Sequence, residues 1–221
     1  MRKLLIIAVL LIAILSWAAD PNPMGDEFGR LSEWFLRTGP KNGEVAPDFK
    51  LERARGGTLQ ASELWASKLL LVTTGSYTCP QFRSVTASRR ELVEEFQSEL
   101  NSVVVYTTEA HPVGAASPYL NREFVTEENR KEGILLPQPQ TYEERLAGAR
   151  RCREILKMRS FVAVDKMDNA VWKAYGSSPN CAYLIDTGGK IVFRQGLFDA
   201  AGMRAAIQKL IMARKALGFP H

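Results

Sequence analysis

Cys79 is the residue of this sequence best placed to act as a nucleophile. The apolar run before it, residues 69–74, predicts a buried strand, and Pro80 after it suits the first position of a helix. A cysteine at such a junction meets the free N–H groups and the positive dipole end of the helix, which favour the reactive thiolate. The sequence therefore predicts a nucleophile at Cys79, with a buried structural cysteine as the alternative.

Two residues that can move protons follow the next predicted strand, residues 103–107. Glu109 and His111 lie just past its end, and the carboxyl ends of parallel strands meet at one edge of a sheet. His111 can stabilise a thiolate or transfer a proton, and we expect Glu109 to orient its ring or set its protonation. Arg83 adds positive charge beside Cys79. A loop histidine without a chemical role is the alternative.

The predicted elements alternate between strands and helices and end in a hairpin and a helix. Before Cys79 they are a small hairpin at 48–51 and 58–60, a short helix at 61–66 and the strand at 69–74. After it come a long helix at 81–100, the strand at 103–107 and a long loop at 109–140. A helix at 141–157, with Thr141 and Glu144 as a capping box, precedes a strand at 161–165 and a short helix at 169–175. A hairpin at 182–186 and 190–194 and a helix at 199–217 come last. This order is that of a thioredoxin-like fold of the α/β class, with a central mixed sheet and helices on both faces.

Cys181 is a candidate for the thiol that would resolve an oxidised Cys79. It lies just before the strand at 182–186, where thioredoxin folds bring a loop beside the nucleophile. Pro179 lies in or near the place usually held by a cis-proline. A buried cysteine at the strand edge is the alternative, and the sequence assigns no role to Cys152.

Composition excludes several classes of function. A net charge of +5, without a dense Lys/Arg block or a basic–aromatic stripe, argues against nucleic-acid binding. Three cysteines are too few for a disulfide scaffold and too widely spaced for a zinc site. The sequence carries no metal, flavin or nucleotide motif, so we expect neither a metal nor a cofactor.

The N-terminus predicts export. Arg2 and Lys3 precede the apolar stretch 4–19, which suits a signal peptide or a short membrane anchor. Positive charge before such a stretch sends the following chain across the membrane, to a periplasmic or other extracytoplasmic location. The predicted organisation is a signal or anchor at 1–19, a short helix and linker at 20–46, and a compact domain at 47–221.

Four ordered blocks of this sequence resemble the iodothyronine deiodinases. The loop 74–82 is similar to their selenocysteine loop, with Cys79 in place of selenocysteine, and 105–112 is similar to their second motif. Residues 135–138 with 144–150 resemble a third block, and 164–169 with 174–176 a fourth. The resemblance spans about residues 69–210, and a hydrophobic N-terminal segment is also a family trait.

The resemblance implies a reaction and the residues that perform it. Cys79 would attack the iodine of an iodinated phenol, Glu109 and His111 would handle the proton, and an external thiol would regenerate the enzyme without a cofactor. Apart from the resemblance, we expect Ser76 and Thr78, which precede the nucleophile in the same loop, to support it. Pro139 stands where the family has a further histidine, which predicts weak turnover of iodothyronines themselves. The substrate class is thus a small halogenated aromatic molecule, and a homodimer is an open possibility.

Two other functions remain open. A thiol peroxidase would use Arg83 to stabilise charge on peroxide, although Val72 fills the slot where peroxiredoxins place a proline and Ser76 fills their second slot. The other alternative is an exported, non-enzymatic binding module. Disulfide exchange is disfavoured because Phe82 takes the place of the second cysteine of a Cys-x-x-Cys motif.

Overall fold

A mixed β-sheet forms the centre of the protein. The computed structural model describes residues 34–35 and 37–216. The strands are β1 (Lys50–Arg53), β2 (Thr58–Gln60), β3 (Leu69–Gly75), β4 (Leu100–Tyr106), β5 (Phe161–Val164), β6 (Ala182–Ile185) and β7 (Ile191–Gln195). They lie in the order β2-β1-β5-β4-β3-β6-β7, with β3, β4 and β5 parallel and the outer neighbours antiparallel. The mixed sheet expected from the sequence is confirmed.

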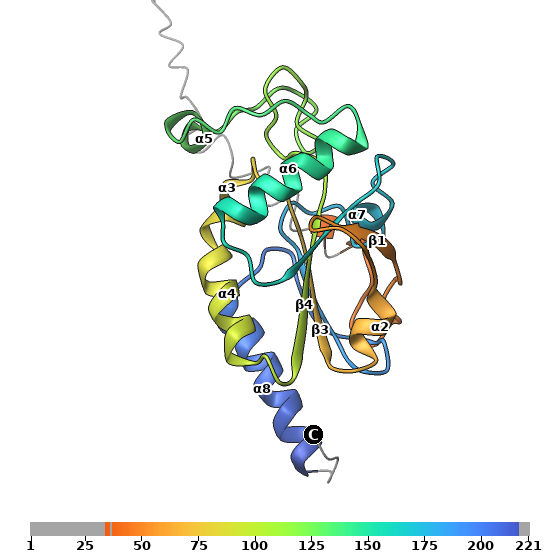
Figure 1. Cartoon of the computed structure of the whole chain (residues 1–221). Helices are drawn as coiled ribbons and strands as arrows, with labels where there is room; N and C mark the ends of the chain where they lie inside the picture. The colour runs from red at the N-terminus through yellow and green to blue at the C-terminus, as the bar shows by residue number, and fades with distance from the viewer. Residues whose placement is uncertain (1–33, 36, 217–221) are drawn as a thin grey trace, which may run out of the picture.

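Helices cover both faces of this sheet. They are α2 (Ala61–Trp65), α3 (Pro80–Ser84), α4 (Thr86–Glu95), α5 (Glu127–Lys131), α6 (Tyr142–Ile155), α7 (Ala170–Ala174) and α8 (Ala200–Ala216). Figure 1 shows α4 and α8 side by side on one face and α2 on the other. The core accordingly divides into one cluster under α2 and α7 and two clusters under α3, α4, α6 and α8.

The central strands bring the ends of β3 and β4 together. β3 is buried along its whole length because it pairs on both sides and is covered on both faces, which explains its continuous apolar sequence. Its parallel register with β4 runs from Leu69 opposite Leu100 to Gly75 opposite Tyr106. The loops that carry Cys79 and His111 therefore leave the sheet at the same edge, as predicted.

The long helix predicted at 81–100 is wrong in detail. Two helices, α3 and α4, meet at Val85, and Leu100 already belongs to β4. The hydroxyl of Thr86 donates to the carbonyl of Phe82 at 2.9 Å, and a side chain that bonds the carbonyl four residues back competes with the helical ladder. This bond lies at the point where α3 ends and α4 begins.

Part of the segment expected to be a linker packs on the domain. Gly43 N–H donates to Ile191 O at 2.7 Å, Ile191 N–H to Glu44 O at 2.9 Å, and Ala46 N–H to Gly189 O at 2.8 Å, so this stretch runs beside β7. Ala46 is buried in the core. The remaining domain boundaries stay predictions.

The predicted signal or anchor at 1–19 lies outside the described residues. Among the helices within residues 34–35 and 37–216, none is long and apolar enough to cross a membrane.

Gly75 is needed at the end of β3 because α3 packs directly over it. A Cβ at this position would overlap the ring of Phe82, which is fully buried. Gly75→Ala should therefore destabilise the protein by about 1–3 kcal/mol, measured by urea unfolding.

The penalty should fall below about 1 kcal/mol in a Phe82→Ala background, where the clash is gone. Equal penalties in both backgrounds would show that the ring does not require the glycine.

Candidate active site

Cys79 lies at the strand-to-helix junction that the sequence predicts. It is the N-cap residue of α3, Pro80 is the first helical residue, and Arg83 N–H donates to the Cys79 carbonyl at 3.2 Å. The backbone N–H groups of Gln81 and Phe82 face the sulfur and lower its pKa, as does the positive charge of Arg83. The local geometry expected for a nucleophile is thus present.

The acidic thiol expected at Cys79 is nevertheless absent. Burial raises its pKa to about 11, because desolvation of the fully buried sulfur outweighs the favourable amides and Arg83. Burial also raises the pKa of Cys181 to about 11 and that of Cys152 still further. Cys79 is therefore a protonated thiol at neutral pH in this conformation.

The buried Glu109 carboxyl ties the two strand-end loops together. Its Oε2 accepts hydrogen bonds from Thr78 N–H at 2.9 Å and from Thr78 Oγ1 at 2.6 Å, and its Oε1 accepts one from the Tyr106 hydroxyl. Burial raises the pKa of Glu109, while these donors oppose the rise. Ser76 adds a further link, since its Oγ accepts from Ala110 N–H at 3.0 Å.

His111 is not oriented by Glu109, contrary to our expectation. The Glu109 carboxyl bonds Thr78 and Tyr106, whereas the His111 ring turns to the loop, with Nδ1 3.1 Å from the Phe124 carbonyl oxygen. Burial lowers the pKa of His111, so the ring is neutral at pH 7. A carbonyl can only accept, so the ring proton lies on Nδ1 and Nε2 keeps its lone pair. Only the His111 backbone joins the network, donating to Thr78 Oγ1 at 3.1 Å.

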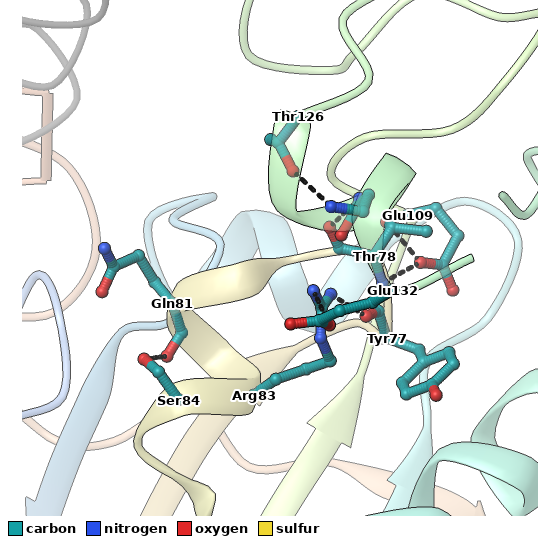
Figure 2. A network of polar contacts seen from close by, with 9 residues as sticks. Tyr77, Thr78, Gln81, Arg83, Ser84, Glu109, Thr126 and Glu132 are labelled. Carbon is teal, nitrogen blue, oxygen red and sulfur yellow. Dashed lines mark hydrogen bonds and ion pairs between the residues drawn. The ribbon is translucent and has the colours of Figure 1, made fainter. Parts of the chain in front are cut away.

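The helix α5 closes over the Cys79 loop. Arg83 donates through Nη1 to the Tyr77 carbonyl at 2.7 Å and through Nη2 to Glu132 just beyond α5 at 2.8 Å, as Figure 2 shows. Asn129 Nδ2 donates to the Thr78 carbonyl at 2.8 Å. The long loop is therefore part of the site, and Arg83 serves as one of its anchors.

Cys181 and Cys79 lie in different core clusters. The Cys181 sulfur is 3.1 Å from Thr74 Oγ1 and belongs to the cluster under α2 and α7. Cys79 belongs to the cluster under α6, which also contains Cys152. Peptide bonds in the described part of the chain are all trans, so Pro179 does not supply the expected cis bond. The resolving role of Cys181 stays a prediction.

A cavity of about 500 Å³ opens beside Glu109. Leu136, Pro137, Pro139 and Ala147 give it a largely apolar wall, and Arg151 adds a cation. Cys79 does not line it. Within residues 34–35 and 37–216, no group of three or more His, Cys, Asp or Glu side chains could hold a metal ion.

Several residues of the site escaped sequence analysis. Gln138 exchanges hydrogen bonds with the Glu109 backbone at 2.8 and 3.2 Å, and its place in the Leu-Leu-Pro-Gln block was the available signal. Asn129 is fully buried within an otherwise polar helix, a placement that only tertiary structure reveals. Tyr119 packs against the cluster that contains Cys79, and its ring lies 5.9 Å from that of Trp172.

The pH dependence of Cys79 reactivity distinguishes a buried thiol from a preformed thiolate. In a Cys152→Ala/Cys181→Ala background, the rate of alkylation by iodoacetamide should rise continuously from pH 7 to pH 10, because the pKa of Cys79 is about 11. A rate that levels off near pH 7 would show that the helix start, rather than burial, controls the thiol.

The architecture is that of known thiol oxidoreductases. The thioredoxin domain of a thiol-disulfide oxidoreductase from Bacteroides vulgatus superposes with a TM-score of 0.52 at 17% identity, covering 77% of this chain and 97% of that one. At this identity the likeness shows the fold alone, and it confirms the predicted thioredoxin-like fold.

The sequence itself is similar to iodothyronine deiodinases. The type II iodothyronine deiodinase of Neoceratodus forsteri is 33% identical over 117 residues and that of Homo sapiens is 36% identical over 111 residues. These matches cover 51% and 48% of this chain but 40% and 37% of the relatives, so the chain spans less than half of their length. A family model described as iodothyronine deiodinase matches residues 34–202. The chain therefore belongs to the iodothyronine deiodinase family.

Proposed function

We propose that this protein is a thiol-dependent oxidoreductase that removes iodine or bromine reductively from a phenolic ring. The observation that carries the proposal is the position of Cys79 at the N-cap of α3, joined through Thr78 to Glu109 and to the His111 backbone. Membership of the deiodinase family supports the same chemistry.

The proposed reaction needs one nucleophile and one proton carrier. The Cys79 sulfur bonds to the halogen as the carbon–halogen bond breaks, and the electron pair of that bond stays on the ring carbon. His111 Nε2 takes the thiol proton and delivers it to this carbon. An external thiol then attacks the sulfenyl halide, which releases halide and a proton and leaves a mixed disulfide. A second thiol reduces the mixed disulfide and restores Cys79.

The cavity beside Glu109 is the proposed entry for the aromatic ring. Its volume of about 500 Å³ and its apolar wall suit a halogenated phenol, and Arg151 can attract a phenolate. Pro139 lies in this wall, where the family has a histidine, so the proposed substrate is a simpler phenol than an iodothyronine.

Access to Cys79 requires α5 to move. The sulfur is buried, and the bonds from Asn129 to Thr78 and from Glu132 to Arg83 hold the covering loop. Breaking them on substrate entry would also bring water or a thiol to the sulfur.

The decisive assay compares halogen removal with peroxide reduction. The reduced protein receives an iodinated phenol or hydrogen peroxide in separate reactions, with dithiothreitol as reductant. We expect slow iodide release that Cys79→Ser abolishes, because a hydroxyl is hardly ionised near neutral pH. Cys152→Ser is the matched control and should keep the activity.

Fast peroxide consumption without iodide release would overturn the dehalogenase and favour the thiol peroxidase, in which Arg83 stabilises the charge on peroxide. An inert Cys79, with neither iodide release nor peroxide consumption by the wild-type protein, would point to the binding module.

His111 should set the acidic limit of activity. Its lowered pKa keeps Nε2 unprotonated, so the rate should fall only below about pH 6.5, where the ring gains a proton. His111→Ala should lower the rate by roughly 10²-fold and remove this acidic limb from the pH–rate profile.

Phe124→Leu, which keeps the backbone carbonyl opposite Nδ1, is the control and should preserve the limb. An unchanged limb in His111→Ala would assign the proton transfer to another group.

Export through residues 1–19, the external thiol reductant and a homodimeric assembly remain predictions that accompany this function.

A further inference from the structure

A basic cavity lies at the end of the sheet opposite Cys79. Two adjoining hollows of about 640 and 290 Å³ share Arg55, Arg153 and Arg159 in their walls. The cations around them are Arg53, Arg55, Arg90, Arg153, Lys157 and Arg159, against the carboxylates Glu94 and Glu154. We call the two hollows together the basic cavity.

The position of the basic cavity separates it from the candidate active site. Its wall includes Phe161, the first residue of β5, whereas the Cys79 and His111 loops leave the carboxyl ends of the parallel strands. A ligand here would contact neither Cys79 nor His111.

The positive charge of the basic cavity is largely uncompensated. Glu94 pairs with Arg159 at 3.0 Å. In the part of the chain that the structure describes, the side chains of Arg55, Arg90 and Lys157 make no hydrogen bond or ion pair. Partial burial, and after it the nearby charge of Arg55, lower the pKa of Arg153.

Hydrogen bonds anchor the turn that carries Arg55 and the side chain of Arg53. Ala54, next to Arg55, donates through its N–H to Val162 O at 2.8 Å and accepts from Arg150 Nε at 2.8 Å, which ties the β1–β2 turn to β5 and α6. Arg53 Nε donates to Gly56 O at 3.1 Å, and a Cβ at Gly57 would lie 2.6 Å from Arg53 Nη2. Arg53 and Arg153 therefore come from β1 and α6, whereas Arg55 lies in the β1–β2 turn and Arg159 in the segment between α6 and β5.

Lys157 occupies a position where glycine would be more stable. It follows the end of α6 with φ of 48°, in the left-handed region. Its N–H donates to Glu154 O at 3.2 Å and Met158 N–H donates to Arg153 O at 3.1 Å, the pairing of a Schellman cap. A lysine in this conformation is strained, and retained strain indicates a role for the side chain.

We propose that the basic cavity binds a compact soluble polyanion that carries several phosphate groups. Arginine forks match phosphate oxygens, and cations that surround a hollow suit a compact anion better than a flat membrane or an extended strand. Phosphates of a free ligand and of a lipid headgroup share this chemistry, so the test separates the two sources.

The test uses the full chain and inorganic tripolyphosphate as the probe. Calorimetry at low salt should show binding that weakens with ionic strength. Arg55→Gln/Arg153→Gln should weaken it by at least about tenfold, while Lys173→Gln, which removes an exposed cation on α7, should not change it.

Lys157→Gly separates binding from folding, because the two should change in opposite directions. The variant should raise Tm by roughly 2–4 °C through relief of the strained cap and weaken tripolyphosphate binding by about fivefold.

Three results would overturn the proposal. One is no binding of tripolyphosphate by the wild-type chain. Another is equal binding by the wild-type chain, Lys157→Gly and the double variant. That result would mean that these cations are only solvated charges near the C-terminal end of a helix and bind no ligand. The third is binding to phosphatidylglycerol vesicles without binding to tripolyphosphate, which would make the surface a membrane contact.

Discussion

The burial of the Glu109 carboxyl is the constraint on which the site depends. A buried carboxyl without partners is strongly unfavourable, and here three donors from Thr78 and Tyr106 satisfy it. Those donors come from the Cys79 loop and from the end of β4. The carboxyl therefore fixes the distance between the nucleophile loop and the His111 loop, and the parallel pairing of β3 and β4 makes that bond possible.

Burial also decides the state of the nucleophile. The same enclosure that satisfies Glu109 desolvates Cys79, and the N-terminal amides of α3 with Arg83 recover only part of the cost of charging its sulfur. The proposed reaction requires the covering loop to open and expose this thiol. The Arg83–Glu132 pair and the Asn129–Thr78 bond oppose that movement.

Local features were predictable from the sequence, and tertiary hydrogen bonds were not. The Cys79 junction and the Thr141–Glu144 capping box depend on neighbouring residues alone, and the structure contains both. The hydrogen-bond partners of Glu109 depend on which donors the fold brings near it. Its closeness to His111 in the sequence therefore led to the wrong prediction that it orients the His111 ring. The break at Val85 coincides with the bond from the Thr86 hydroxyl to the Phe82 carbonyl, a signal too weak to locate without coordinates.

The basic cavity could not be predicted from the sequence for a related reason. The cations of the basic cavity are scattered from residue 53 to residue 159 in the chain and gather only through the pairing of β1 with β5 and the packing of α6. The strand β4 has seven residues and so separates the two ends of the sheet by roughly 20 Å. That is about twice the screening length at physiological salt. The pKa of Cys79 accordingly depends on its own burial, the α3 amides, Arg83 and Glu109, and not on the cations of the basic cavity.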